Sequence, residues 1–131
     1  MHAPGRLILS VPDLAKIARL LCSDGAVDGR RVLAPQSMEE LRAPQARRGS
    51  VSGDAGRGLG VAFAPDVFGR RLAIGHQGVA YGMNAEVWGD PATGDAVAMA
   101  TNGALLSPAG TLIRCGWAAT RIGFEALARA K

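Results

Sequence analysis

The stretch that decides the fold is AEVWGDPATGDAVAMAT, residues 85–101. Two short apolar runs, Ala85 to Trp88 and Ala96 to Thr101, flank the turn-forming sequence Asp90-Pro91-Ala92-Thr93-Gly94. Asp, Pro and Gly favour tight turns, and a connection this short joins neighbouring antiparallel strands. The sequence therefore predicts a β-hairpin with its loop at residues 90–94.

Two further apolar runs precede the hairpin, at Leu59 to Ala64 and Arg71 to Gly75, and each is bounded by turn-forming residues. Together the four runs predict an antiparallel meander of about three to four strands. A long helix is predicted at the end of the chain, over Thr111 to Ala130, because the apolar residues there form one broad helical face. These residues are Leu112, Ile113, Trp117, Ile122, Phe124 and Leu127.

The first third of the chain has helical spacing instead. Ser10 is a predicted N-cap, and apolar residues recur at helical spacing from there through Cys22. A second, short helix is predicted over Pro35 to Arg42, where Ser37 and Glu40 have capping-box spacing. Between the helices, Asp28-Gly29 predicts a tight turn, and residues 45–57 read as a polar loop.

The chain has 131 residues, which fits one domain over 1–131. Residues 1–57 form its helical and loop region, and residues 58–131 form the meander and the closing helix, so the class is α+β. Hydrophobic residues make up 48% and charged residues 20%, a balance that excludes a disordered chain. No run of about 18 apolar residues predicts a membrane span. The first residues do not have the pattern of a signal peptide.

The net charge is +4, but this charge does not predict a nucleic-acid partner. The arginines are scattered as singles and pairs, and no aromatic residues interleave with them to stack on bases. Cys22 and Cys115 lie on predicted helices and are interpreted as small buried side chains, with a single disulfide as the alternative. Two cysteines and two histidines provide no zinc-ligand spacing, so neither a metal nor a cofactor is expected.

The stretch GHQGVAYGMN, residues 75–84, contains the candidate site. His76 ends an apolar run, and glycines around it permit close approach of a ligand to the backbone. The alternative interpretation makes His76 a structural hydrogen-bonding residue at a strand end. Tyr81 and Asn84 are interpreted as loop residues.

Four segments, in order, resemble the C-terminal half of the serine β-lactamase and DD-peptidase-like hydrolases. This family includes class C β-lactamases, D-alanyl-D-alanine carboxypeptidases and related esterases. The segments span nearly the whole chain, and each alone is a weak signal. They are GRLILSVPDLA at 5–15, DGRRVLAPQS at 28–37, GLGV at 58–61, and GHQG at 75–78 followed by Asp90-Pro91 and Thr101-Asn102-Gly103.

The resemblance implies a role for four consecutive residues. His76 would stand at the Lys or His position of the third catalytic motif, and the backbone N–H of Val79 would match the second oxyanion donor. Gln77 and Gly78 would contact substrate. Gln77 departs from the Thr or Ser usual in the family, so an esterase or amidase is as well supported as a lactam hydrolase.

The family nucleophile, the Ser of Ser-x-x-Lys, is absent from these residues, because no serine has a lysine three positions later. The Tyr-x-Asn motif is absent too. Three hypotheses follow: a substrate-binding half that is active only with a complementing N-terminal hydrolase half, a non-catalytic remnant that self-associates or binds a partner, and an unrelated α+β module. In the family the last strand, here about Ala96 to Thr101, pairs with an N-terminal strand. Its edge is therefore expected to be open to a second copy or to a complementing half.

Overall fold

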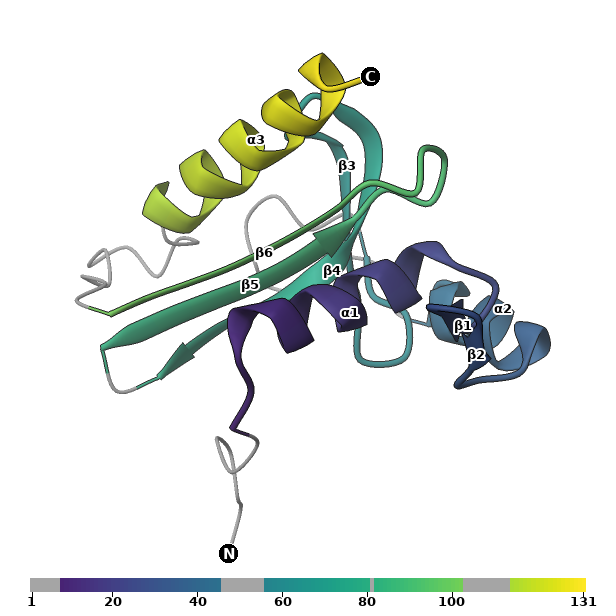
Figure 1. The fold of residues 1–131 in the computed structure, drawn as a ribbon. Coiled ribbons are helices and arrows are strands. Elements are labelled where there is room, and N and C mark those ends of the chain that lie inside the picture. The colour runs from purple at the N-terminus through teal and green to yellow at the C-terminus, as the bar shows by residue number, and fades with distance from the viewer. Residues whose placement is uncertain (1–7, 46–55, 81, 103–113) are drawn as a thin grey trace, which may run out of the picture.

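The computed structural model describes residues 8–45, 56–80, 82–102 and 114–131. Within them the chain has the predicted α+β class, with helices packed on both faces of a four-stranded antiparallel sheet (Figure 1). The elements, in chain order, are α1 (Val11–Cys22), β1 (Ala26–Val27), β2 (Arg30–Arg31), α2 (Pro35–Arg42), β3 (Ala62–Val67), β4 (Arg70–Ala80), β5 (Met83–Gly89), β6 (Ala96–Asn102) and α3 (Arg114–Arg129).

The sheet is the predicted meander, with strand order β3-β4-β5-β6 and antiparallel pairing throughout. The β5–β6 hairpin is confirmed. Its loop closes with the Gly94 N–H on the Asp90 carbonyl at 2.8 Å, and the Asp90 carboxylate accepts the Ala92 N–H at 2.9 Å. Gly94 has a φ of 74°, a left-handed conformation that favours glycine.

All four strands differ in their bounds from the predicted runs, most clearly β3 and β4. β3 begins at Ala62 rather than Leu59, because Gly58 donates to the Val61 carbonyl at 3.0 Å across a local turn in which Gly60 has a φ of 72°. β4 continues past Gly75 to Ala80, since β5 pairs with it along that whole length. Asn84 is part of β5 and fully buried, so its prediction as a loop residue is wrong; Tyr81 lies outside the described residues.

The helix starts give one confirmed cap and one correction. Ser10 caps α1, with its hydroxyl oxygen accepting the Asp13 N–H at 3.2 Å. The capping box predicted at Ser37 and Glu40 is wrong: α2 begins at Pro35, after an Ala34 cap that makes no side-chain hydrogen bond. Proline fits the first helical position, which places Ser37 inside the first turn rather than before it.

The two faces of the sheet bury separate apolar clusters, as the alternation of side chains along each strand requires. On one face, under α3, the buried cluster is Ala62, Ala64, Phe68, Ala73, Trp88 and Phe124. On the other face, under α1, it is Leu21, Val61, Phe63 and Ile74. The first and the last predicted helices, α1 and α3, therefore cover the sheet, one on each side (Figure 1). Residues 111–113 of the predicted closing helix lie outside the described residues.

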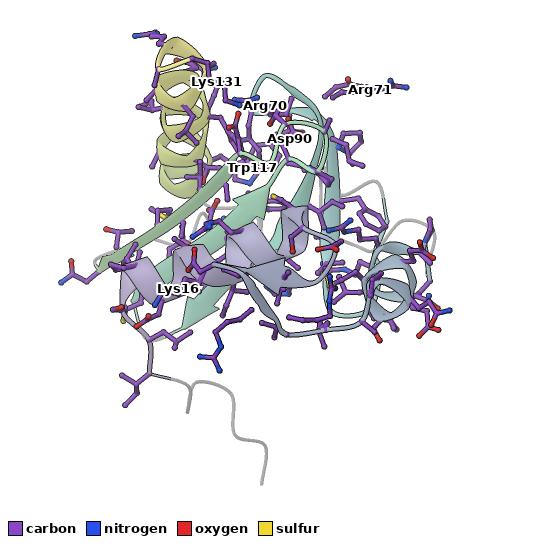
Figure 2. All side chains as sticks on the ribbon, turned by 45° about the vertical axis from the view of Figure 1, so that its right-hand side comes forward. Lys16, Arg70, Arg71, Asp90, Trp117 and Lys131 are labelled. Carbon is purple, nitrogen blue, oxygen red and sulfur yellow. The ribbon has the colours of Figure 1, made fainter. Side chains whose placement is uncertain are left out.

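A cluster of buried charges ties the C-terminal end of α3 to the hairpin. The Arg70 guanidinium lies 3.0 Å from the Asp95 carboxylate and 3.5 Å from that of Asp90. It also donates to the Phe124 carbonyl at 2.9 Å, and Lys131 reaches Asp95 at 2.8 Å. Figure 2 shows Arg70, Asp90 and Lys131 gathered at this end of the molecule.

Candidate functional site

Strand β4 is longer than its neighbour β3, so part of β4 has a paired strand on only one side among the described residues. Pairing with β3 runs from Val67↔Arg70 to Ala62↔Gly75, whereas pairing with β5 continues to Ala80. Residues 76–80 therefore have β5 on one side and, among the described residues, no strand on the other. We call this segment the β4 edge.

The direction of the backbone groups along the β4 edge follows from one hydrogen bond in β3. The Phe63 N–H donates to the Gly56 carbonyl at 3.1 Å, so it points away from β4. Successive residues of a strand face opposite neighbours, so Ala62 faces β4 and its partner Gly75 faces β3. By the same alternation, Gln77 and Val79 direct their N–H and C=O groups to the open side.

The glycines of β4 support this assignment. A Cβ at Gly75 would collide with the Val87 carbonyl, and one at Gly78 would lie 3.7 Å from the Ala85 carbonyl. Both carbonyls of β5 are thus turned toward β4, as they must be if His76 and Gly78, their register partners, bond to β5. Gln77 and Val79, which alternate with His76 and Gly78, therefore direct their backbone groups away from β5.

The four residues singled out in the sequence lie consecutively on the β4 edge, and their side chains differ in accessibility. His76 is exposed, opposite Val87 on the α1 side of the sheet. Gly78 is exposed, and Val79 is 38% exposed. Gln77 is half-buried and faces the α3 side, where its amide nitrogen donates to a carboxylate oxygen of Glu86.

Glu86 is the functional candidate that the sequence reasoning missed. It is 1% exposed, and its carboxylate accepts four hydrogen bonds from neutral donors. Besides Gln77, these donors are Asn84 Nδ2 at 3.2 Å, Trp88 Nε1 at 3.1 Å and Thr120 Oγ1 at 3.1 Å. The alternation of Asn84, Glu86 and Trp88 in an apolar strand was the available signal, since all three then lie on one face.

Gly116 makes the Glu86 network geometrically feasible. A Cβ at this position would collide with Glu86 Oε1 and Asn84 Nδ2. Glycine therefore lets the first turn of α3, as described, pack directly on the carboxylate. The network holds the Gln77 side chain on the α3 face of the sheet, while strand alternation directs its backbone groups to the open side of the β4 edge.

The remaining predicted chemistry is sparse in the described part of the chain. Burial raises the pKa of the Cys22 thiol to about 11, and its Sγ lies 3.4 Å from the carbonyls of Ala18 and Asp95, so it is a packed thiol. The side chain of Cys115 lies outside the described residues. In residues 8–45, 56–80, 82–102 and 114–131 there is no cluster of three potential metal ligands and no helix long and apolar enough to cross a membrane.

Comparison with models of protein families, with curated proteins and with solved structures found no match. The resemblance to the β-lactamase-like hydrolases thus stays a prediction, and the candidate site depends on the geometry of the β4 edge.

Proposed function

We propose that this chain is the substrate-binding C-terminal part of a β-lactamase-like serine hydrolase that cleaves an amide, ester or lactam through an acyl-enzyme. The observation that supports the proposal is the β4 edge, where Gln77 and Val79 present backbone groups on the open side. An extended substrate can bind such an edge as an added strand, with hydrogen bonds to these two residues.

Three residues of the β4 edge then have distinct roles. The Val79 N–H donates to the oxyanion of the tetrahedral intermediate, an interaction worth about 3–4 kcal/mol of barrier lowering in other hydrolases. Gly78 has no side chain, so substrate can approach the strand closely. The exposed imidazole of His76 provides a hydrogen-bonding group beside the reacting centre.

The nucleophile must come from elsewhere. Acyl transfer needs a hydroxyl with a base in reach, and these 131 residues contain no Ser-x-x-Lys. We propose that polypeptide outside them contributes the serine and the lysine. Alone, the chain is therefore expected to bind substrate without turning it over.

The test is covalent labelling. The purified chain is incubated with a fluorophosphonate and with a penicillin, alone and with a Ser-x-x-Lys-containing N-terminal half of a family member, and the intact mass of each polypeptide is recorded. We expect no adduct on the chain alone, and an adduct on the added half only when both are present. An adduct on the chain alone contradicts the assignment of the nucleophile.

A variant pair tests the role of Val79 in the complemented enzyme. Val79→Pro removes the outward N–H but leaves the pairing with β5, because proline is tolerated at a strand edge. It should slow acylation by on the order of 100-fold. Val79→Ala retains the N–H and should react at nearly the rate of the parent; equal rates for both variants would exclude Val79 as an oxyanion donor.

The second candidate function is a non-catalytic module that self-associates. The observation that favours it is the outer edge of β6, to which no strand pairs within the described residues. This function predicts that the chain alone has a defined oligomeric state and that adding a hydrolase half restores no labelling.

A further inference from the structure

The Gln77 side chain lies between the β4 edge and the buried Glu86 carboxylate. Its amide nitrogen donates to Glu86 Oε1. An ionised carboxylate only accepts hydrogen bonds, so the carboxamide must turn its nitrogen toward Glu86 and its oxygen away. Gln77 is half-buried, and among the described residues no donor bonds to Gln77 Oε1. The side chain therefore offers a hydrogen-bond acceptor on the α3 face of the β4 edge.

Asn84, on the neighbouring strand β5, is oriented in the same way. Its amide nitrogen donates to the same Glu86 Oε1 at 3.2 Å, and within the described part of the chain its buried Oδ1 has no hydrogen-bond partner. Trp88 and Thr120 donate to the other carboxylate oxygen at 3.1 Å each. Both carboxamides thus use their nitrogens on Glu86, and their oxygens are left as acceptors.

The carboxylate also gives this part of the β4 edge a negative charge. Its four hydrogen-bond partners are all neutral, so none of them cancels the charge. His76 lies on the opposite face of the sheet, and the backbone of Arg57 pairs with β3 on the side away from β4. Donation to a carboxylate also polarises the Gln77 amide, which makes its oxygen a stronger acceptor. A cationic donor is therefore favoured beside Gln77 Oε1, and a carboxylate is disfavoured.

We propose that the substrate of the β4 edge carries a cationic hydrogen-bond donor, such as an ammonium group, opposite Gln77, and that a substrate with a carboxylate there is rejected. This inference rests on the proposed function, which supplies the extended substrate bound to Gln77 and Val79. In an added strand, the residue directly opposite Gln77 directs its side chain to the same face, with Cβ atoms about 5 Å apart. A lysine-like side chain at that position can reach Gln77 Oε1.

Gln77 and Glu86 then determine specificity and take no part in the chemical step. Gln77 lies two residues before Val79, so the substrate group that it contacts is about 7 Å from the carbonyl bound at the Val79 N–H. Glu86 acts through Gln77, as a positioning residue that fixes which end of the carboxamide faces the substrate. A substrate cation at this distance from the scissile bond is the substrate class that the geometry favours.

The binding of short peptides to the chain alone tests the charge preference. The probes are three N-acetylated peptide amides, Ala-Ala-Xaa-Ala-Ala, in which Xaa is lysine, norleucine or glutamate. An NMR titration of the isotope-labelled chain follows the backbone amides of Gln77 and Val79 and the side-chain amide of Gln77. We expect the lysine peptide to bind on the order of 10-fold more tightly than the glutamate peptide, with norleucine between them. Equal dissociation constants, tighter binding of glutamate, or no shift at the β4 edge with any peptide overturns the proposal.

A matched pair of variants shows whether position 77 sets the preference. Gln77→Arg keeps the outward backbone groups, pairs with the Glu86 charge and replaces the acceptor by donors only. It should reverse the order, so that the glutamate peptide binds most tightly. Gln36→Arg makes the same charge change at an exposed position of α2 and should keep the wild-type order. A Gln77→Arg protein that has a wild-type circular dichroism spectrum and still prefers lysine overturns the role of Gln77.

The labelling experiment decides the proposed function separately. Labelling of the complemented enzyme together with equal binding of the three peptides would leave the hydrolase standing and overturn the inferred substrate class. The expected order of peptide binding without any labelling would support the cation-selective β4 edge and contradict the hydrolase.

Discussion

At the scale of single residues, Glu86 is the side chain on which the centre of the sheet depends. Its carboxylate is 1% exposed and collects donors from β4, from its own strand and from α3. Burying a polar group costs free energy unless the group is hydrogen-bonded. The donors around Glu86 would lose a hydrogen-bond partner if its carboxylate were removed. Glu86 also accepts a hydrogen bond from the Gln77 side chain. The carboxylate therefore contributes both to the stability of the core and to the position of Gln77 on the β4 edge.

We predict that Glu86→Gln lowers the free energy of unfolding by about 2–3 kcal/mol, because an amide group replaces an acceptor oxygen and leaves buried donors unpaired. Urea unfolding followed by circular dichroism measures the change. Glu125→Gln is the control, since this glutamate is exposed and pairs with two exposed arginines; it should change stability by less than about 0.5 kcal/mol. An equally stable Glu86→Gln protein would show that the network contributes nothing.

At the scale of elements, α3 is held to the sheet by two different contacts. Near its start Gly116 packs on the Glu86 network, and near its end Arg70 donates to the Phe124 carbonyl and lies over the Phe124 ring at 4.9 Å. Close backbone approach at one end and a buried cation at the other determine how the helix lies across β5 and β6.

We expect Gly116→Ala to destabilise the protein by about 1–3 kcal/mol, although alanine has the higher helix propensity. The new methyl group would collide with Glu86 and Asn84, which are held by their hydrogen bonds. Thermal unfolding measures the effect. Ala118→Gly, at an exposed position of the same helix, isolates the propensity difference of about 1 kcal/mol. A stabilised Gly116→Ala protein would mean that α3 shifts freely on the sheet.

At the scale of the whole molecule, one charge cluster joins β4, the β5–β6 hairpin and the segment after α3. Its members are Arg70, Asp90, Asp95 and Lys131. The hydrogen bond from Lys131 to Asp95, assisted by Thr93 and by the charge of Arg70, holds the pKa of the Asp95 carboxyl below its ordinary value of 3.8. The folded state therefore releases this proton more readily than the unfolded state. The stabilisation is complete above about pH 4 and is lost as the pH falls through the lowered pKa.

The corresponding prediction concerns the acid limb of the stability profile. Asp95→Asn should unfold more easily than the wild type at pH 6, and the difference should shrink as the pH is lowered below about 4. Urea midpoints between pH 2 and pH 7 test this. Asp66→Asn, at an exposed aspartate, is the control. The difference between its urea midpoint and that of the wild type should not shrink below pH 4 in the same way. If the difference in urea midpoint between Asp95→Asn and the wild type did not depend on pH, the charge of Asp95 would not be the source of the stabilisation.

The residues themselves were enough to predict the meander and the two long helices, because local turn chemistry and side-chain periodicity determine them. The hairpin loop at 90–94 and the Ser10 cap are examples in which the deciding groups are neighbours in sequence. The length of β4 was not predictable in this way. Residues 76–80 are not an apolar alternating run, and they are a strand because β5 pairs with them.

What the sequence by itself determined is the class of the fold and the order of the helices and of the four-stranded meander. The site around His76 stays a prediction. Only the tertiary structure decided that β4 extends beyond β3, that Gln77 bonds to a buried Glu86, and that β6 is the last strand of the sheet among the described residues. The physical reason is separation along the chain. Turns and helix caps depend on residues within a few positions of one another, whereas a free strand edge and a buried carboxylate depend on which distant segments pack together.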